Sequence, residues 1–211
     1  MSDRQSHWER VYTSKNENEV SWFQATPATS VDLIMATGAT VRSAIIDIGG
    51  GASRLVDVLL RTGFRSLAVL DLSNAALSAA RARLGGGASH VEWIVADVTQ
   101  WTPTRRYDVW HDRAAFHFLT ERADRAAYLT RLRQALKPKG QAIIGTFAAD
   151  GPEKCSGLPV QRYDAASLQE TLGSDFRLLS AFRETHVTPW GATQSFQFAR
   201  FQYGTDETAS S

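Results

Sequence analysis

Short apolar runs alternate with helical patterns along most of the chain from about residue 43. The expected buried strands are 43–47, 66–71, 91–96, 107–110 and 141–147. The expected helices between them are 52–62, 73–84 and 121–136, the second with Ser73 as its N-cap. This alternation predicts a parallel sheet with helices on both faces.

The pattern changes near the C-terminus. After a helix expected near 164–172, two strand-like runs at 176–185 and 193–201 are separated by a turn that contains Pro189, Trp190 and Gly191. So close a connection predicts an antiparallel hairpin at one end of the sheet. The expected fold class is therefore α/β, a Rossmann-like doubly wound sheet that ends in a hairpin.

The chain divides into a short N-terminal part, one domain and a tail. Residues 1–42 read as a lid or cap that is rich in aromatic residues, with a helix opening near Pro27. Residues 43–203 form the expected domain. Residues 204–211 have the small polar composition of a flexible tail.

Length, charge and cysteine content argue against several classes of function. A chain of 211 residues, 43% of them apolar, builds one core and is too short for two ordinary domains. A net charge of +1 gives no overall attraction to nucleic acid or to an anionic membrane. The polar start and the charges at Asp47 and Asp57 argue against a secretion signal or a membrane span. The single Cys155 fits a reducing cytoplasm, and the five histidines lack metal-site spacing, so no metal is expected.

Candidate chemistry gathers where the first three expected strands end. Asp47, Asp71 and Asp97 stand there, each about one strand-helix unit from the next. In an open α/β sheet, ligands bind beyond the carboxyl ends of the strands. One such acid is as readily a helix cap or a solvated loop charge, but three in register predict a ligand site.

The glycine turn after the first strand restricts the class of ligand that we expect. Gly49, Gly50 and Gly51 let the backbone approach a ligand closely and supply amide donors. A dinucleotide fingerprint would need a further glycine at position 54, where the chain has Arg54, and this counts against NAD or FAD.

The three acids fit an adenosine that carries an amino-acid group. Asp71 lies about 20 residues past Gly51, where a carboxylate accepts hydrogen bonds from ribose hydroxyls. Asp97 and the N–H of Val98 are placed to read adenine, and Asp47 suits an ammonium group better than a pyrophosphate. An adenosine with an ammonium and a sulfonium but no phosphate is S-adenosyl-L-methionine.

The sequence resembles the class I S-adenosylmethionine-dependent methyltransferases over about residues 40–200. The motifs that carry the resemblance are Ile46-Asp47-Ile48-Gly49-Gly50-Gly51-Ala52-Ser53, Val69-Leu70-Asp71-Leu72-Ser73, Ala96-Asp97-Val98, Tyr107-Asp108-Val109-Trp110 and Leu136-Lys137-Pro138-Lys139-Gly140. The resemblance implies a seven-stranded sheet with six parallel strands and one antiparallel. The expected cofactor contacts are Asp47, Gly49, Gly51, Asp71, Leu72, Asp97, Val98, His111 and Trp22.

The opening segments Trp8-Glu9-Arg10-Val11-Tyr12 and Ser21-Trp22-Phe23 are similar to two branches of that superfamily. One branch methylates small thiols and thiopurines, and the other methylates protein lysines, including the citrate synthase type. Both place such a segment over the cofactor as a lid, although the same aromatic residues also suit simple packing on the core. The expected substrate contacts are Trp8, Tyr12, Arg113 and Trp190.

The stretch after the fourth expected strand holds the candidate catalytic residues His111, Asp112 and His117. His111 and His117 have ordinary pKa values of about 6.5 and suit a general base, with Asp112 orienting or replacing them. In the structural interpretation, Asp112 instead caps a turn and His117 lies on a half-buried helix face.

Methyl transfer from a sulfonium requires mainly alignment and exclusion of water. The leading hypothesis is transfer to an N, S or related nucleophile of a small molecule, and a protein lysine is the alternative. A non-catalytic cofactor-binding protein and a nicotinamide oxidoreductase are further alternatives, and Arg54 disfavours the second.

Overall fold

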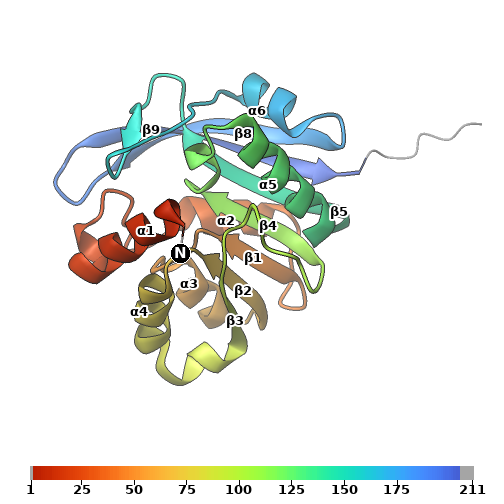
Figure 1. Ribbon diagram of the computed structural model, residues 1–211. Helices are drawn as coiled ribbons and strands as arrows, with labels where there is room; N and C mark the ends of the chain where they lie inside the picture. Colours follow the sequence, from red (N-terminus) through yellow and green to blue (C-terminus); the bar gives the residue numbers. More distant parts are fainter. Residues whose placement is uncertain (1, 205–211) are drawn as a thin grey trace, which may run out of the picture.

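The computed structural model describes residues 2–204 and contains a seven-stranded sheet with the strand order β3-β2-β1-β4-β5-β9-β8 (Figure 1). The strands are β1 (Ala44–Ile48), β2 (Ser66–Asp71), β3 (Val91–Val95), β4 (Tyr107–Arg113), β5 (Leu136–Phe147), β8 (Phe176–Val187) and β9 (Thr193–Tyr203). A separate two-stranded ribbon consists of β6 (Lys154–Cys155) and β7 (Leu158–Pro159).

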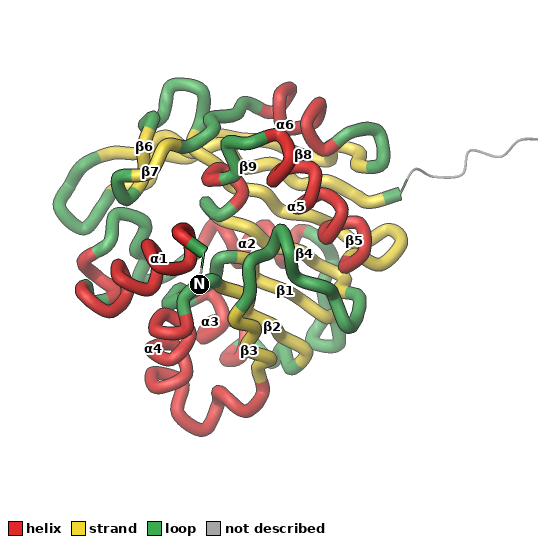
Figure 2. Tube along the Cα trace, viewed as in Figure 1, coloured by secondary structure: helices red, strands yellow, loops and turns green. Residues whose placement is uncertain are grey.

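The direction of the strands confirms the expected fold class. Neighbouring strands from β3 to β5 are parallel, whereas β9 is antiparallel to both β5 and β8. Six strands therefore run one way and β9 runs the other. The hairpin β8-β9 forms one end of the sheet, as the short connection predicts (Figure 2).

Helices cover both faces of the sheet. On one face, α2 (Ala28–Ala36), α3 (Leu55–Arg61) and α4 (Asn74–Leu84) bury apolar side chains such as Ile34, Leu59 and Leu77. On the other face, α5 (Arg122–Ala135) and α6 (Ala165–Leu172) bury Leu132 and Leu168 among others. The central strands β1 and β2 are thus buried on both sides, which accounts for their nearly continuous apolar sequences.

Capping residues set the start of two helices. The Ser73 side chain accepts a hydrogen bond from the backbone N–H of Ala76 at the start of α4, as predicted. Asp164 and Ser167 form a reciprocal capping box on α6. The helix expected over 52–62 is shorter, because residues 52–54 form a turn and α3 begins only at Leu55.

Several strand boundaries differ from the expected ones by one or more residues, and both strands of the hairpin continue two residues further than expected. The fourth strand continues through His111, Asp112 and Arg113, because β4 keeps pairing with β1 and β5 that far. The fifth strand begins at Leu136 instead of residue 141, and the third ends at Val95. Polar side chains within a buried strand interrupt the apolar pattern from which the strand is predicted. The backbone hydrogen bonds to the neighbouring strands nevertheless continue through these residues.

The N-terminal part forms α1 (Asp3–Ser14), a 3-10 turn η1 (Glu17–Glu19) and α2. Helix α1 lies beside α4, near the edge where β1 and β2 end (Figure 1). No helix in residues 2–204 is long and apolar enough to cross a membrane. Of the expected tail, residues 205–211 lie outside the described residues.

Candidate active site

A cavity of about 850 Å³, including space open to solvent, lies between α1 and the carboxyl ends of β1, β2, β3 and β4. Its lining includes residues from both halves of the sheet and from α1: Arg4, Trp8, Tyr12, Trp22, Gly49, Asp71, Leu72, Asp97, Val98, Arg113, Phe118, Phe147, Cys155, Gln194 and Phe196. A smaller cavity adjoins it, because Tyr12, Trp22, Gly49 and Arg113 line both.

The glycine turn after β1 packs so closely that side chains do not fit. Gly49 has a φ of +65°, and a Cβ there would lie 2.6 Å from the Cβ of Ala115. Gly51 has a φ of +44°, and its Cβ would lie 2.9 Å from Oδ2 of Asp71. Gly49 lines both cavities, so its backbone is open to a ligand there, whereas Gly51 lines neither of the two.

Asp71 ends β2 and lies buried at the floor of the cavity. Its Oδ1 accepts a hydrogen bond of 2.8 Å from the N–H of Ser73. Burial raises the pKa of Asp71 to about 7, and the carboxylates of Asp47 and Glu9 add to the rise, whereas the N–H groups of Ser73 and Gly51 oppose it. Its carboxyl group therefore titrates near neutrality.

Asp97 and Val98 line the cavity in the turn that follows β3. The Oδ1 atom of Asp97 accepts hydrogen bonds from the N–H and the hydroxyl of Thr99 at 2.9 and 2.7 Å. Its Oδ2 atom lies 3.5 Å from Nη2 of Arg4 on α1. The structure thus brings Asp71 and Asp97 to one cavity, as predicted.

Asp47, His111 and Ser30 form a buried polar chain beside the smaller cavity. Nδ1 of His111 lies 2.7 Å from Oδ1 of Asp47, and its Nε2 lies 2.9 Å from Oγ of Ser30. Because a carboxylate only accepts hydrogen bonds, Nδ1 of His111 carries a proton and donates it to Asp47. His111 thus lines the smaller cavity but not the larger one.

Aromatic side chains from α1 and the following segment cover the cavity. The Trp8 ring packs edge-on against Trp22 and Phe118, with ring centres 5.6 and 5.0 Å apart. The Nε1 of Trp22 donates a 3.2 Å hydrogen bond to the hydroxyl of Tyr12. Three of the predicted aromatic contacts therefore meet at the cavity.

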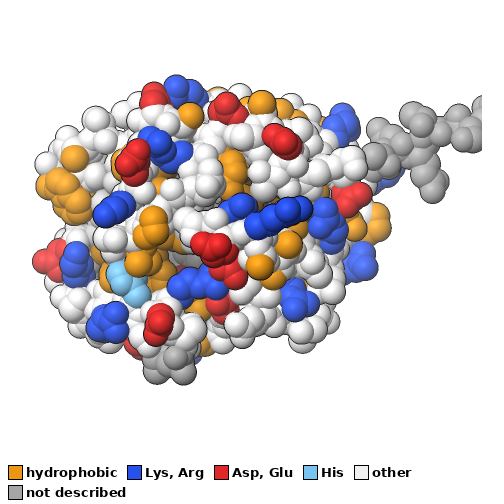
Figure 3. Space-filling view, turned by 45° about the horizontal axis from the view of Figure 1, so that its top comes forward, with side chains coloured by type: hydrophobic (Ala, Val, Ile, Leu, Met, Phe, Trp, Pro, Cys, Tyr) orange, Lys and Arg blue, Asp and Glu red, His pale blue; other side chains and the backbone are white. Residues whose placement is uncertain are grey.

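Two charged residues attach α1 to the domain. Glu9 accepts hydrogen bonds from the hydroxyl of Ser73 and the N–H of Ala75 at 2.8 and 3.2 Å, at the N-terminus of α4. Arg4 pairs with Asp97 and, at 3.3 Å, with Asp124. Figure 3 shows charged side chains of both signs over the surface of the molecule.

Two predicted catalytic residues are not among those lining the cavities. Asp112 is fully buried, and its carboxylate accepts hydrogen bonds from the N–H groups of Ala115 and Phe116 and from the hydroxyl of Tyr128. His117 is also fully buried, and its Nδ1 accepts the N–H of Phe147 at 3.3 Å. Burial lowers the pKa of His117 to about 3, with a contribution from the charge of Arg113.

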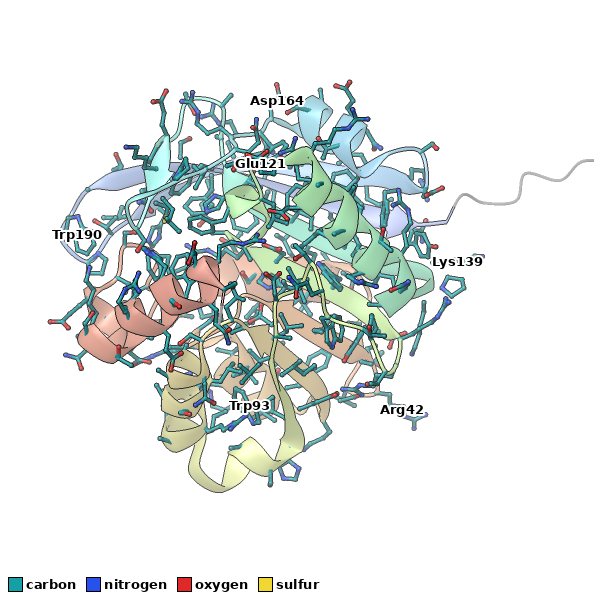
Figure 4. The ribbon with its side chains drawn as sticks, in the orientation of Figure 1. Arg42, Trp93, Glu121, Lys139, Asp164 and Trp190 are labelled. Atoms are coloured by element: carbon teal, nitrogen blue, oxygen red, sulfur yellow. The ribbon has the colours of Figure 1, made fainter. Side chains whose placement is uncertain are left out.

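Trp190 also lies away from the cavity. It is 60% exposed at the tip of the β8-β9 hairpin, at the edge of the molecule (Figure 4). The hairpin instead contributes Gln194 and Phe196, which sequence reasoning missed. The alternation of apolar residues along β9 indicates that Phe196 is buried, but it does not indicate that Phe196 lines this cavity.

Cys155, Arg4 and Ser30 were likewise not predicted as site residues. Cys155 is buried in β6 and lines the larger cavity, and burial raises the pKa of its thiol to about 11. No local signal identifies these residues, because their role follows from contacts between distant segments.

Residues 45–140 match a family model described as a methyltransferase domain. This segment runs from β1 to the start of β5 and includes the glycine turn and all three strand-end acids. No curated protein sequence matches the chain significantly.

Solved structures with the same fold span nearly the whole chain. A structure from work on converting a disulfide bond into a thioacetal group in echinomycin biosynthesis has a TM-score of 0.77 and 20% identity, covering 98% of this chain and 93% of that one. A methyltransferase from Anabaena variabilis has a TM-score of 0.74 and 17% identity, covering 96% of each chain. The N-methyltransferase NodS from Bradyrhizobium japonicum has a TM-score of 0.70 and 16% identity, covering 92% and 97%.

The chain therefore has the fold of these solved structures, and its residues 45–140 are similar to a methyltransferase domain.

Proposed function

We propose that this protein transfers the methyl group of S-adenosyl-L-methionine to a nitrogen, sulfur or related nucleophile of a small molecule. The observation that carries the proposal is one cavity that joins Asp71, Asp97 and the glycine turn to an aromatic compartment under α1. Such a cavity holds an adenosine cofactor at one end and an acceptor at the other. Similar structures include an N-methyltransferase from Burkholderia thailandensis solved with 1,6-didemethyltoxoflavin and S-adenosylhomocysteine.

We place the cofactor in the half of the cavity that contains the acids. Asp71 accepts hydrogen bonds from the ribose hydroxyls, and Asp97 with the N–H of Val98 reads adenine. The amino-acid end extends past Gly49 toward Asp47 and His111, where a carboxylate faces the ammonium group. Each contact uses a group that lines one of the two cavities.

The chemical step depends on alignment. No histidine is among the described residues that line the larger cavity, and His111 is held by Asp47 and Ser30 in the smaller one. An acceptor that arrives with a free lone pair needs no base for in-line displacement at the sulfonium methyl. Asp112 and His117 act in this proposal through the turn that they support, and not as acid or base.

A small acceptor is favoured over a protein lysine. The acceptor compartment is walled by Trp8, Trp22, Phe118, Phe147 and Phe196. Arg113 brings a positive charge into it, which opposes a lysine ammonium. The lining carboxylates, Asp71 and Asp97, belong to the cofactor end.

Calorimetry with S-adenosylhomocysteine tests the cofactor assignment. We expect micromolar or tighter binding, no binding of NAD, and at least tenfold weaker binding by Asp71→Ala, because charged hydrogen bonds contribute about 1.5–3 kcal/mol each. Asp175→Ala, at an exposed salt bridge with Arg133, is the matched control and should bind like wild type. Unchanged binding by Asp71→Ala would contradict the assignment of Asp71 to the ribose.

A further inference from the structure

Arg113 lines both cavities and carries two hydrogen-bond donors that have no partner among the described residues. Its Nη1 donates 2.9 Å to the carbonyl of Trp22, and its guanidinium carbon lies 5.0 Å from the centre of the Phe196 ring. Its Nε and Nη2 are buried, and neither has a hydrogen-bond partner among the described residues. These two atoms lie on one edge of the guanidinium, the edge that binds both oxygens of a carboxylate side by side.

No acidic side chain among the described residues forms an ion pair with the Arg113 guanidinium. Glu184, Cys155 and Asp47 act on Arg113 from a distance, but none of them hydrogen bonds to Nε or Nη2. Burial lowers the pKa of Arg113 only to about 10, so the guanidinium is positive at neutral pH. A buried charge with open donors is costly unless a ligand pairs with it.

Gln194 adds a second open group in the same compartment. Its Oε1 is buried without a hydrogen-bond partner in the described part of the chain, and its side chain lines the larger cavity. A side-chain amide oxygen accepts from an N–H or O–H group. Aromatic side chains, among them Trp22 and Phe196, line the same cavity as these two polar groups.

We infer that the methyl acceptor is a flat small molecule with a carboxylate, which Arg113 binds through Nε and Nη2, and with an N–H or O–H group for Gln194. This inference rests on the proposed function and specifies its substrate class. The aromatic walls hold the body of the acceptor, and the carboxylate fixes its orientation toward the sulfonium.

The carboxylate belongs to the acceptor and not to the cofactor for a geometric reason. Arg113 lines both cavities, but its guanidinium packs on Phe196 of β9, with Cys155 of β6 nearby, and Phe196 and Cys155 line the larger cavity only. The polar groups that suit the amino-acid end of the cofactor, Asp47 and His111, line the smaller one.

Matched ligand pairs test the inference on protein saturated with S-adenosylhomocysteine. The pairs are benzoate against benzamide and indole-3-acetate against indole-3-acetamide, measured by calorimetry. In at least one pair we expect the acid to bind tenfold or more tightly than the amide. Arg113→Gln should remove that difference, whereas the exposed Arg177→Gln on β8, which pairs with Gln202, should keep it.

A second variant leaves Arg113 in place and therefore keeps its hydrogen bond to the carbonyl of Trp22. Gln194→Glu places a negative charge in the same cavity, so it should weaken binding of the acids at least fivefold more than it weakens binding of the amides. This result remains informative if Arg113→Gln fails to fold.

Three outcomes separate the possibilities. Failure of wild-type protein to bind S-adenosylhomocysteine overturns the proposed function itself. Binding of S-adenosylhomocysteine with equal affinity for acid and amide in both pairs overturns only the carboxylate inference. The inference also fails if Arg113→Gln weakens S-adenosylhomocysteine but not 5′-methylthioadenosine, which lacks the amino-acid group, because Arg113 then serves the cofactor.

Discussion

Single residues in this site have properties that their position in the fold creates. Asp71 is the clearest case, because burial and neighbouring carboxylates raise its pKa to about 7. Only the ionised carboxylate accepts hydrogen bonds from both ribose hydroxyls. The affinity for S-adenosylhomocysteine should therefore depend on pH in the physiological range.

The sign of that dependence follows from proton linkage. Below pH 7 the free protein carries a proton on Asp71 that binding must remove, so affinity at pH 6 should be about tenfold weaker than at pH 8. Above pH 8 it should level off. Asp71→Asn should bind weakly at pH 8 and lose most of this dependence. Calorimetry across pH 5.5–8.5 measures both, and a flat wild-type profile would contradict the assignment.

His117 offers a second test at this scale. It packs between Phe118 and Phe147, and its neutral ring accepts a backbone N–H. His117→Ala should cost roughly 2–4 kcal/mol, a fall of about 5–15 °C in Tm, with S-adenosylhomocysteine affinity within threefold of wild type. A rate loss of 100-fold with wild-type Tm would instead make His117 a base.

The pKa of His117 adds a pH signature. Its folded value of about 3 lies below its unfolded value of 6.5, so its stabilising effect is complete above pH 6.5 and is lost as pH falls toward 3. Wild type should therefore lose more stability between pH 7 and pH 5 than His117→Ala. Denaturant unfolding at the two pH values measures this, and equal losses would count against the buried neutral state.

At the scale of elements, Asp112 links the end of β4 to the turn that borders the acceptor compartment. Its carboxylate holds Ala115 and Phe116, and Tyr128 of α5 donates to it. Asp112→Asn loses charge and at least one of these bonds, so it should lower stability by about 2–3 kcal/mol.

A residue on the same strand serves as the control for Asp112. Asp108→Asn alters a more exposed carboxylate that accepts from Ala44 and pairs with Lys137. It should cost less than half as much in thermal or denaturant unfolding. Equal losses would show that burial at Asp112 is not the cause.

Helix α1 is the second element with a testable role. Glu9 attaches it to the N-terminus of α4, over the cofactor half of the cavity. Glu9→Ala should accelerate hydrogen exchange over residues 3–14 at least tenfold, and S-adenosylhomocysteine should slow that exchange in wild type. Asp3→Asn on the same helix is the control. If S-adenosylhomocysteine leaves this exchange unchanged, α1 simply packs on the domain and does not act as a lid.

At the scale of the whole molecule, ligand binding and stability are coupled. A ligand at 100 times its Kd adds about 2.7 kcal/mol to the free energy of unfolding. For a chain of 211 residues this raises the Tm by about 5–10 °C. S-adenosylhomocysteine should produce that shift and NAD none, which thermal unfolding measures directly. Equal shifts from both ligands would indicate a general nucleotide site.

The sequence by itself determined the layered α/β fold and the meeting of Asp71 and Asp97 at one cavity. Apolar runs of strand length that alternate with helical periodicity permit few other arrangements. Asp71 and Asp97 could be predicted together because the carboxyl ends of parallel strands meet at one edge of the sheet. The glycine turn could be identified from the sequence because glycine is required where the chain packs too closely for a side chain, as it does at Gly49.

Only the tertiary structure decided the acceptor half. Side chains alternate across a strand, so once β4 extends to Arg113, His111 and Arg113 face the cavities while Asp112 turns toward α5. Local sequence does not show where a strand with polar residues ends, and so it could not separate these roles. Gln194 reaches the same compartment from β9 through long-range pairing, because contacts between distant segments depend on how the whole sheet assembles and not on the residues beside each one.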